Sequence, residues 1–231
     1  MKNVMITAHS GCEGTPDNSV ASIETGIALG ADCVEVDVRM DAAGKLWLTH
    51  DTASDYGALI PLEAAFERVA ASRAAVNCDL KEYAALRPVL ALADRCGVGP
   101  AQLALSGSVD PALLGRDPEI ARRARIFLNC EELVFAMAPD LPRTPKAIVD
   151  FIEQNLPRIA DGFHAAGAEA LNAPFRLLTP ERIAVLRARE VPLSLWTVNE
   201  APHLRRLLKE NPRNITTRSV RLALRLRAEA D

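Results

Sequence analysis

The chain has 231 residues, of which 49% are hydrophobic and 25% charged, and its formal net charge at pH 7 is −3. This is the ordinary composition of a globular protein with enough apolar residues for a sizeable core. A slightly acidic chain has no overall attraction to nucleic acid, so we expect no nucleic-acid partner.

The sequence shows no segment typical of a membrane or export signal. It has no stretch of 18 apolar residues and no long apolar run after Met1, so we expect neither stable membrane insertion nor a signal peptide. The cysteines number five, and no two have the spacing of a zinc knuckle or a redox pair. Reduced thiols are typical of the cytoplasm, which is the expected location, and we expect a monomer or a homodimer.

Short apolar runs alternate with helix-length amphipathic segments, a pattern typical of βα units and a parallel sheet. The sequence predicts strands at 4–9, 33–38, 75–80, 103–106, 125–130, 170–172, 193–198 and 214–217. It predicts helices at 19–30, 61–72, 82–96, 110–116, 145–166, 180–190, 201–210 and 218–229. Eight strands, each followed by a helix, predict an α/β fold, a TIM (β/α)8 barrel in a single domain over residues 1–231.

Two predicted strands carry polar residues on one face only. In 33–38 the three valines share one face and Glu35 shares the other with Asp37. In 76–81 the apolar residues again take one face and the polar residues the other. Active sites of such barrels lie at the carboxyl ends of the strands. We therefore expect the polar faces to line the mouth together with residues near other strand ends: Asn77, Asp79, Lys81, His9, Asn129, Asn172 and Trp196.

Glu35 and Asp37 lie two residues apart on one strand face, close enough to repel each other. A divalent cation would resolve this repulsion, and oxygen ligands suit Mg²⁺ or Ca²⁺. Asp79, on the next strand at the same level, is the candidate third ligand. The alternative is a set of salt bridges in which Lys81, Arg39 or another base neutralises the carboxylates.

Two histidines flank this carboxylate cluster. His9 ends the first strand, and His50 follows a short extension of the second strand, residues 47–49. Such a pair can supply one base and one acid near neutral pH. Lys81, above the cluster, is a candidate to neutralise a phosphate oxygen; the alternative is that it pairs with Asp79.

The order of these motifs resembles the glycerophosphodiester phosphodiesterase family, whose usual pattern is His-Arg-Gly, Pro-Glu-Asn, Glu-x-Asp and His-Asp. The corresponding runs here are His9-Ser10-Gly11, Pro16-Asp17-Asn18, Glu35-Val36-Asp37 and His50-Asp51. The resemblance continues at Asp79-Leu80-Lys81, where the family usually has Glu-x-Lys, and at Trp196-Thr197-Val198-Asn199.

The resemblance implies a TIM-barrel enzyme that hydrolyses a glycerophosphodiester to glycerol 3-phosphate and an alcohol. It makes His9 and His50 the catalytic acid–base pair. It makes Glu35, Asp37 and Asp79 the ligands of one divalent metal, Mg²⁺ or Ca²⁺, with Mn²⁺ also possible. It makes Lys81 a phosphate contact and lets Trp196 line the pocket of a small-molecule diester.

Several positions depart from the family pattern. Ser10 stands at the substrate-binding position of the usual arginine, so we expect weaker phosphate binding, which Ser10→Arg would tighten. The family's insertion of several dozen residues after His-Asp is nearly absent, so we expect an open mouth beside the second βα loop. The usual Thr-Asp near the C-terminus reads Thr217-Arg218, and Arg218 is expected on a solvated last helix together with Arg221, Arg225 and Arg227.

Two other functions remain open from the sequence. One is a phospholipase D-like enzyme that acts on lysolipids and releases a cyclic phosphate, which would need exposed apolar loops near the mouth. The other is a non-catalytic binder of a phosphate ligand. The presence of both histidines and all three carboxylates favours an enzyme.

Overall fold

The computed structural model describes residues 4–230, which form a closed barrel of eight parallel strands. The barrel strands are β1 Met5–Ala8, β2 Cys33–Met40, β4 Ala75–Leu80, β5 Leu103–Gly107, β6 Arg125–Asn129, β7 Ala170–Pro174, β8 Leu193–Trp196 and β9 Asn214–Thr217. The ring closes because β1 pairs in parallel with both β9 and β2. The predicted TIM (β/α)8 barrel is confirmed.

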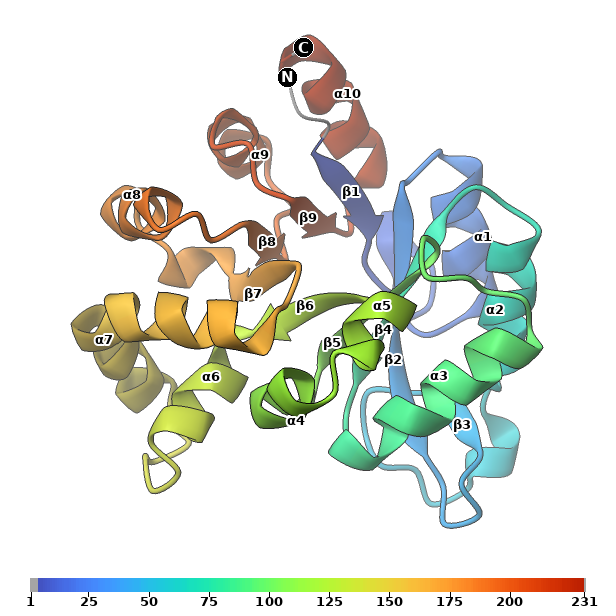
Figure 1. Cartoon of the computed structure of the whole chain (residues 1–231). Coiled ribbons are helices and arrows are strands. Elements are labelled where there is room, and N and C mark those ends of the chain that lie inside the picture. Colours follow the sequence, from blue (N-terminus) through green and yellow to red (C-terminus); the bar gives the residue numbers. More distant parts are fainter. Residues whose placement is uncertain (1–3, 231) are drawn as a thin grey trace.

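The helices lie outside the ring of strands (Figure 1). They are α1 Val20–Ala28, α2 Leu62–Ala70, α3 Leu86–Arg95, α4 Pro111–Arg116, α5 Glu119–Arg123, α6 Cys130–Met137, α7 Pro145–Ala166, α8 Pro180–Ala188, α9 Ala201–Lys209 and α10 Val220–Ala230. Short 3₁₀ turns are η1 Cys12–Gly14, η2 Tyr56–Ala58, η3 Tyr83–Ala85 and η4 Phe175–Leu177. None of the described helices is both long and apolar enough to cross a membrane.

Alternation along the strands divides apolar from polar side chains as the sequence predicts. Val34, Val36 and Val38 point outward into the core that the helices cover. Inside the barrel, a separate apolar cluster near the amino ends of the strands forms a floor; it comprises Met5, Cys33, Ala75, Ala104, Phe127 and Ala170. Two residues further along each of these strands the inward position is polar: Thr7, Glu35, Asn77, Ser106, Asn129 and Asn172. The interior thus changes from apolar to polar toward the carboxyl ends.

A hairpin above β2 brings His50 to the mouth of the barrel. β3, Leu46–Leu48, runs antiparallel to the end of β2 with Val38 opposite Leu48. The turn between them is held by Asp41, whose carboxylate accepts the N–H groups of Ala43 and Lys45 at 2.9 Å each. The N–H of Thr49 then donates to the carbonyl of Asp37 at 3.1 Å. The chain therefore returns to the level of Asp37 just before His50.

The structure contains two helices that the sequence did not predict. α6 begins at Cys130, directly after β6, where the prediction extended the strand by one residue and left the following segment unassigned. Because no turn lies between β6 and α6, no Gly or Pro marks their boundary in the sequence. α5 has only five residues, too few for a hydrophobic period to show.

Candidate active site

A cavity of about 580 Å³ opens at the carboxyl ends of the strands. Both histidines, all three carboxylates, Lys81 and Trp196 line it, as predicted from the sequence. Residues 52–61, with the single turn η2, are all that lies between Asp51 and α2. On that side the side chain of His50 is 68% exposed and that of Asp51 90% exposed, so the mouth is open where the sequence predicts it.

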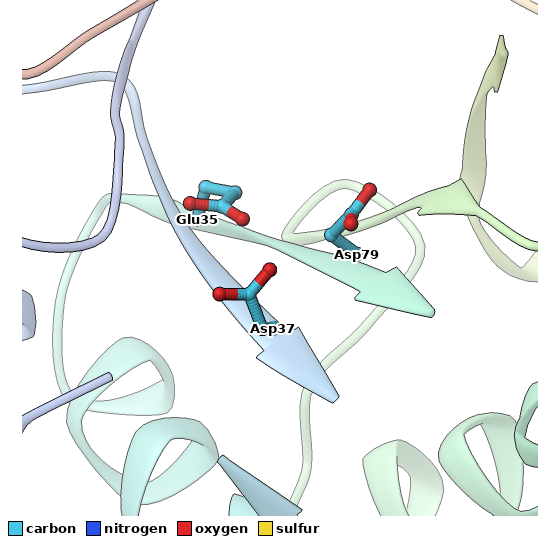
Figure 2. Close-up of side chains that lie close together, drawn as sticks. All are labelled: Glu35, Asp37 and Asp79. Atoms are coloured by element: carbon cyan, nitrogen blue, oxygen red, sulfur yellow. The ribbon is translucent and has the colours of Figure 1, made fainter. Parts of the chain in front are cut away.

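The three carboxylates converge on one point above the strands. Glu35 and Asp37 extend from β2 and Asp79 extends from β4, and the strand register sets Asp37 directly opposite Asp79 (Figure 2). One oxygen from each carboxylate lies within 4.8 Å of the others. Oxygen atoms that share a Ca²⁺ or Mg²⁺ ion lie about 2.0–2.6 Å from it, so three oxygens this close can hold one such ion.

Burial makes this cluster electrostatically costly. Burial, together with the carboxylates of Asp37 and Asp79, holds the pKa of Glu35 well above its ordinary value. Burial acts in the same direction on Asp37, but the Lys81 ammonium and the Asn18 amide outweigh it, and the pKa of Asp37 lies below its ordinary value. Glu35 is therefore the member of the cluster whose charge is least compensated by the protein.

Lys81 accounts for part of the compensation. Its ammonium lies 2.6 Å from Oδ1 of Asp37 and 2.5 Å from Oδ2 of Asp79. Burial acts to lower the pKa of Lys81, but the two carboxylates outweigh it and hold that pKa above its ordinary value. The salt bridges of Lys81, which the sequence left open as an alternative to a metal ion, are thus present for these two aspartates. Arg39 takes no part, since it pairs with Glu82 at 3.1 Å.

The remaining oxygen atoms of the site fit a divalent cation. Glu35 accepts the Ser10 N–H at 2.9 Å, and its nearest basic group is Nδ1 of His9 at 3.7 Å. Asn77 lies opposite Glu35 in the β2–β4 register, and its buried Oδ1 has no hydrogen-bond partner among the described residues. Hard oxygen donors around an uncompensated carboxylate are the environment that Mg²⁺ and Ca²⁺ prefer.

Asn18, supported by Ser10, holds Asp37 in place. The Asn18 side chain donates to Oδ2 of Asp37 at 2.8 Å and accepts the backbone N–H of Asp37 at 2.9 Å. Asn18 has a positive φ of 51°, a conformation that asparagine tolerates better than most residues. Its own N–H donates to the Ser10 hydroxyl. In the sequence Asn18 stands out only as a member of the Pro16-Asp17-Asn18 run, and Ser19, the next residue, caps α1.

Ser10 does not face the substrate cavity, contrary to the expectation from its position in the motif. It is 1% exposed, and its side chain supports Asn18. An arginine at position 10 would have to displace these contacts, so tighter phosphate binding in Ser10→Arg no longer follows.

Both histidines line the cavity, and in each ring Nδ1 is the nitrogen that contacts the protein. Nδ1 of His9 lies 2.8 Å from the carbonyl oxygen of Ser10, which can only accept, so Nδ1 carries a proton in that bond. Nδ1 of His50 lies 2.8 Å from Oδ1 of Asp51. In each ring Nε2 is left for a ligand, which is the arrangement that acid–base chemistry requires.

A hydrogen-bonded chain connects the third carboxylate to the next strands. Asn77 donates to the Ser106 hydroxyl at 2.9 Å, and Ser106 donates to Oδ1 of Asp79 at 2.7 Å. On the neighbouring strands β6 and β7, the side-chain amides of Asn129 and Asn172 meet at 2.7 Å, and Trp196 lines the same cavity. Ser106 was not predicted as a site residue, although alternation along β5 places it on the inward face.

Comparison with known proteins agrees with this geometry. The model of the glycerophosphoryl diester phosphodiesterase family matches residues 9–68, the segment that contains His9, Glu35, Asp37 and His50. The match confirms the resemblance to this family. No curated protein matches the chain.

Solved structures share the whole barrel. A glycerophosphodiester phosphodiesterase from Parabacteroides distasonis aligns with a TM-score of 0.73 at 15% identity, covering 99% of each chain. One from Thermotoga maritima aligns at 0.69 and 19% identity, covering 98% of this chain and 99% of the other. An Oleispira antarctica phosphodiesterase in complex with its product sn-glycerol-3-phosphate aligns at 0.68 and 13% identity, covering 96% of each. At these identities the likeness shows the fold.

Proposed function

We propose that the chain is a metal-dependent phosphodiesterase that hydrolyses a glycerophosphodiester to glycerol 3-phosphate and an alcohol. The observation that carries the proposal is the meeting of three carboxylates and two histidines in one cavity at the carboxyl ends of the strands. The family match over residues 9–68 supports it, as does the product complex of the Oleispira protein.

Glu35, Asp37 and Asp79 would hold one divalent ion, Mg²⁺ or Ca²⁺, with Mn²⁺ also possible. Such an ion would bind the phosphate and offset the charge that builds in the transition state. Asn18 keeps Asp37 oriented and charged for this task through the two hydrogen bonds described above. Lys81 lines the same cavity beside this cluster, and its ammonium would contact a phosphate oxygen there in addition to Asp37 and Asp79.

The two histidines would transfer the protons. A glycerophosphodiester carries a hydroxyl next to its phosphate ester, and this oxygen can attack phosphorus. One histidine takes the hydroxyl proton, and the other gives a proton to the departing alcohol. Water then opens the resulting cyclic phosphate with the histidine roles reversed. No side-chain nucleophile is needed in either step.

The open side of the mouth would receive the alcohol. His50 and Asp51 stand at that side with most of their surface exposed, because the loop of residues 52–61 is short. A bulky alcohol therefore meets no wall there, and Trp196 also lines the cavity. We expect modest activity on simple glycerophosphodiesters and higher activity on a diester with a larger alcohol.

The test is a panel of glycerophosphodiesters that differ in their alcohol, incubated with purified protein in Mg²⁺, Ca²⁺, Mn²⁺ or chelator. The proposal predicts turnover of at least one diester with metal and none with chelator or in Asp37→Ala. Asp161→Ala, on α7 outside the cavity and 73% exposed, is the matched control and should keep its turnover. Full turnover in chelator would refute the metal site, and a folded protein inert toward every diester would favour a phosphate-binding role.

A further inference from the structure

Arg218 follows the last strand of the barrel and lies at the mouth of the cavity beside His9. The parallel pairing of β1 and β9 sets Ala8 opposite Thr217, and the N–H of His9 donates to the carbonyl of Thr217 at 2.9 Å. His9 and Arg218 therefore leave the barrel rim at neighbouring points. Among the described residues that line the cavity, Arg218 is the only arginine.

The backbone of Arg218 is fixed between two loops. Its N–H donates to Oδ1 of Asn199 at 2.8 Å, and its carbonyl accepts the N–H of Glu13 at 2.8 Å. The first contact comes from the loop after β8 and the second from the turn after β1. The point from which the side chain extends is thus held firmly at the rim.

The guanidinium has an exchangeable partner. Its Nη2 lies 2.9 Å from Oδ1 of Asp17, and the two side chains are 43% and 57% exposed. An ion pair this exposed contributes little to stability. Gly11, with φ at 75°, leaves room for the pair, since a Cβ there would lie 2.1 Å from Oδ1 of Asp17 and 3.2 Å from Nη1 of Arg218. A stronger anion can therefore replace Asp17 without a change in the backbone.

The charges around the cavity leave Arg218 as the group that can bind an anionic ligand. The cavity lining includes five carboxylates and two basic side chains, Lys81 and Arg218. Lys81 forms ion pairs with two members of the carboxylate cluster, Asp37 and Asp79. The loop between β1 and α1 contains no lysine or arginine. On the His9 side of the cavity, Arg218 is thus the one described cation available to an anionic ligand.

We propose that Arg218 is a substrate-binding residue whose guanidinium leaves Asp17 and binds the non-bridging oxygens of the substrate phosphate beside His9. The planar guanidinium fork matches two phosphate oxygens, which a lysine ammonium cannot do. This rests on the proposed function for the identity of the ligand as a phosphodiester. It also replaces the prediction that Arg218 belongs to a solvated helix face.

Arg218→Ala tests the proposal, with Arg221→Ala as the matched control. Arg221 is a solvent-exposed arginine of α10 that does not line the cavity. Hydrogen bonds to a charged group contribute enough that Arg218→Ala should raise KM for the diester about 10- to 100-fold, with little change in kcat. Arg218→Lys should recover only part of this loss, and Arg221→Ala should match the wild type.

Titration calorimetry with inorganic phosphate in Mg²⁺ buffer gives a second readout that does not need turnover. Arg218→Ala should weaken phosphate binding and Arg221→Ala should not. Wild-type KM and phosphate affinity in Arg218→Ala would overturn the proposal, as would an equal loss in Arg221→Ala. If the wild type hydrolyses no diester but its phosphate affinity depends on Arg218, the proposed function fails while the phosphate-binding role of Arg218 stands.

Discussion

Replacing Glu35 by glutamine should stabilise the metal-free protein and abolish its stabilisation by metal. Glutamine keeps an oxygen for the Ser10 N–H, which lies 2.9 Å from Oε2 of Glu35, and its amide N–H groups can face the neighbouring carboxylates. The substitution therefore removes the buried charge with little change in shape. It also removes one of the three carboxylates proposed as metal ligands.

The pH dependence follows from the raised pKa of Glu35. Because that pKa lies above the ordinary value of 4.5 in the folded state, the folded protein binds more protons than the unfolded chain at intermediate pH. Stability of the metal-free wild type is therefore lost as pH rises from about 4.5 through the folded pKa. In chelator, Glu35→Gln should melt above the wild type at pH 7.5, and the difference should shrink as pH falls toward 4.5.

The effect of metal has a calculable size. An ion present at 100 times its dissociation constant stabilises the wild type by about 2.7 kcal/mol. For a chain of this length that raises Tm by roughly 5 to 10 °C. The assay is thermal unfolding followed by circular dichroism in chelator and in Mg²⁺, Ca²⁺ or Mn²⁺. Glu35→Gln should show no such shift, whereas Glu24→Gln, an exposed surface change, should behave as the wild type.

Two results would refute this reasoning. A wild-type Tm that is the same in chelator and in every ion would mean that the cluster holds no divalent metal. A Glu35→Gln variant that melts below the wild type in chelator at pH 7.5 would mean that the buried carboxylate stabilises the fold through contacts other than a metal.

Three further predictions concern the site. His9→Ala and His50→Ala should each lower kcat about 10²- to 10⁴-fold while keeping the metal-induced rise in Tm; loss of that rise would show that the histidines bind the metal instead. A diester without the neighbouring hydroxyl should react far more slowly in a steady-state assay, and equal rates would exclude internal attack. Asn18→Ala removes the hydrogen bond that the side-chain amide donates to Asp37 at 2.8 Å, so calorimetry should show metal binding about 10- to 100-fold weaker; unchanged affinity would show that Asp37 needs no such support.

The barrel and its polar mouth could be predicted from the sequence because strand alternation is a local property. The spacing of Glu35 and Asp37 in a run of valines specifies which face is inward, and the structure bears this out. The pairing of Asp37 with Asp79 needed only the assumption that consecutive strands are neighbours.

Features that depend on the path of a loop or the direction of one side chain could not be predicted in this way. A closed barrel implies that the last strand pairs with the first, but nothing in the sequence indicates that Arg218 lines the cavity beside His9 instead of joining the solvated last helix. Ser10 was expected to face the substrate, but the path of the loop turns its hydroxyl toward the Asn18 N–H. The sequence left open whether Lys81 contacts the carboxylates, and the structure places its ammonium between Asp37 and Asp79.

The most direct test of the central claim is ³¹P NMR of a glycerophosphodiester incubated with the protein in Mg²⁺ or Ca²⁺. We predict that the diester resonance disappears, that a glycerol phosphate resonance replaces it, and that neither change occurs in chelator or with Asp37→Ala. A diester resonance that persists beside correctly folded protein in every ion would contradict the account. So would an equal rate of loss in chelator and with Asp37→Ala.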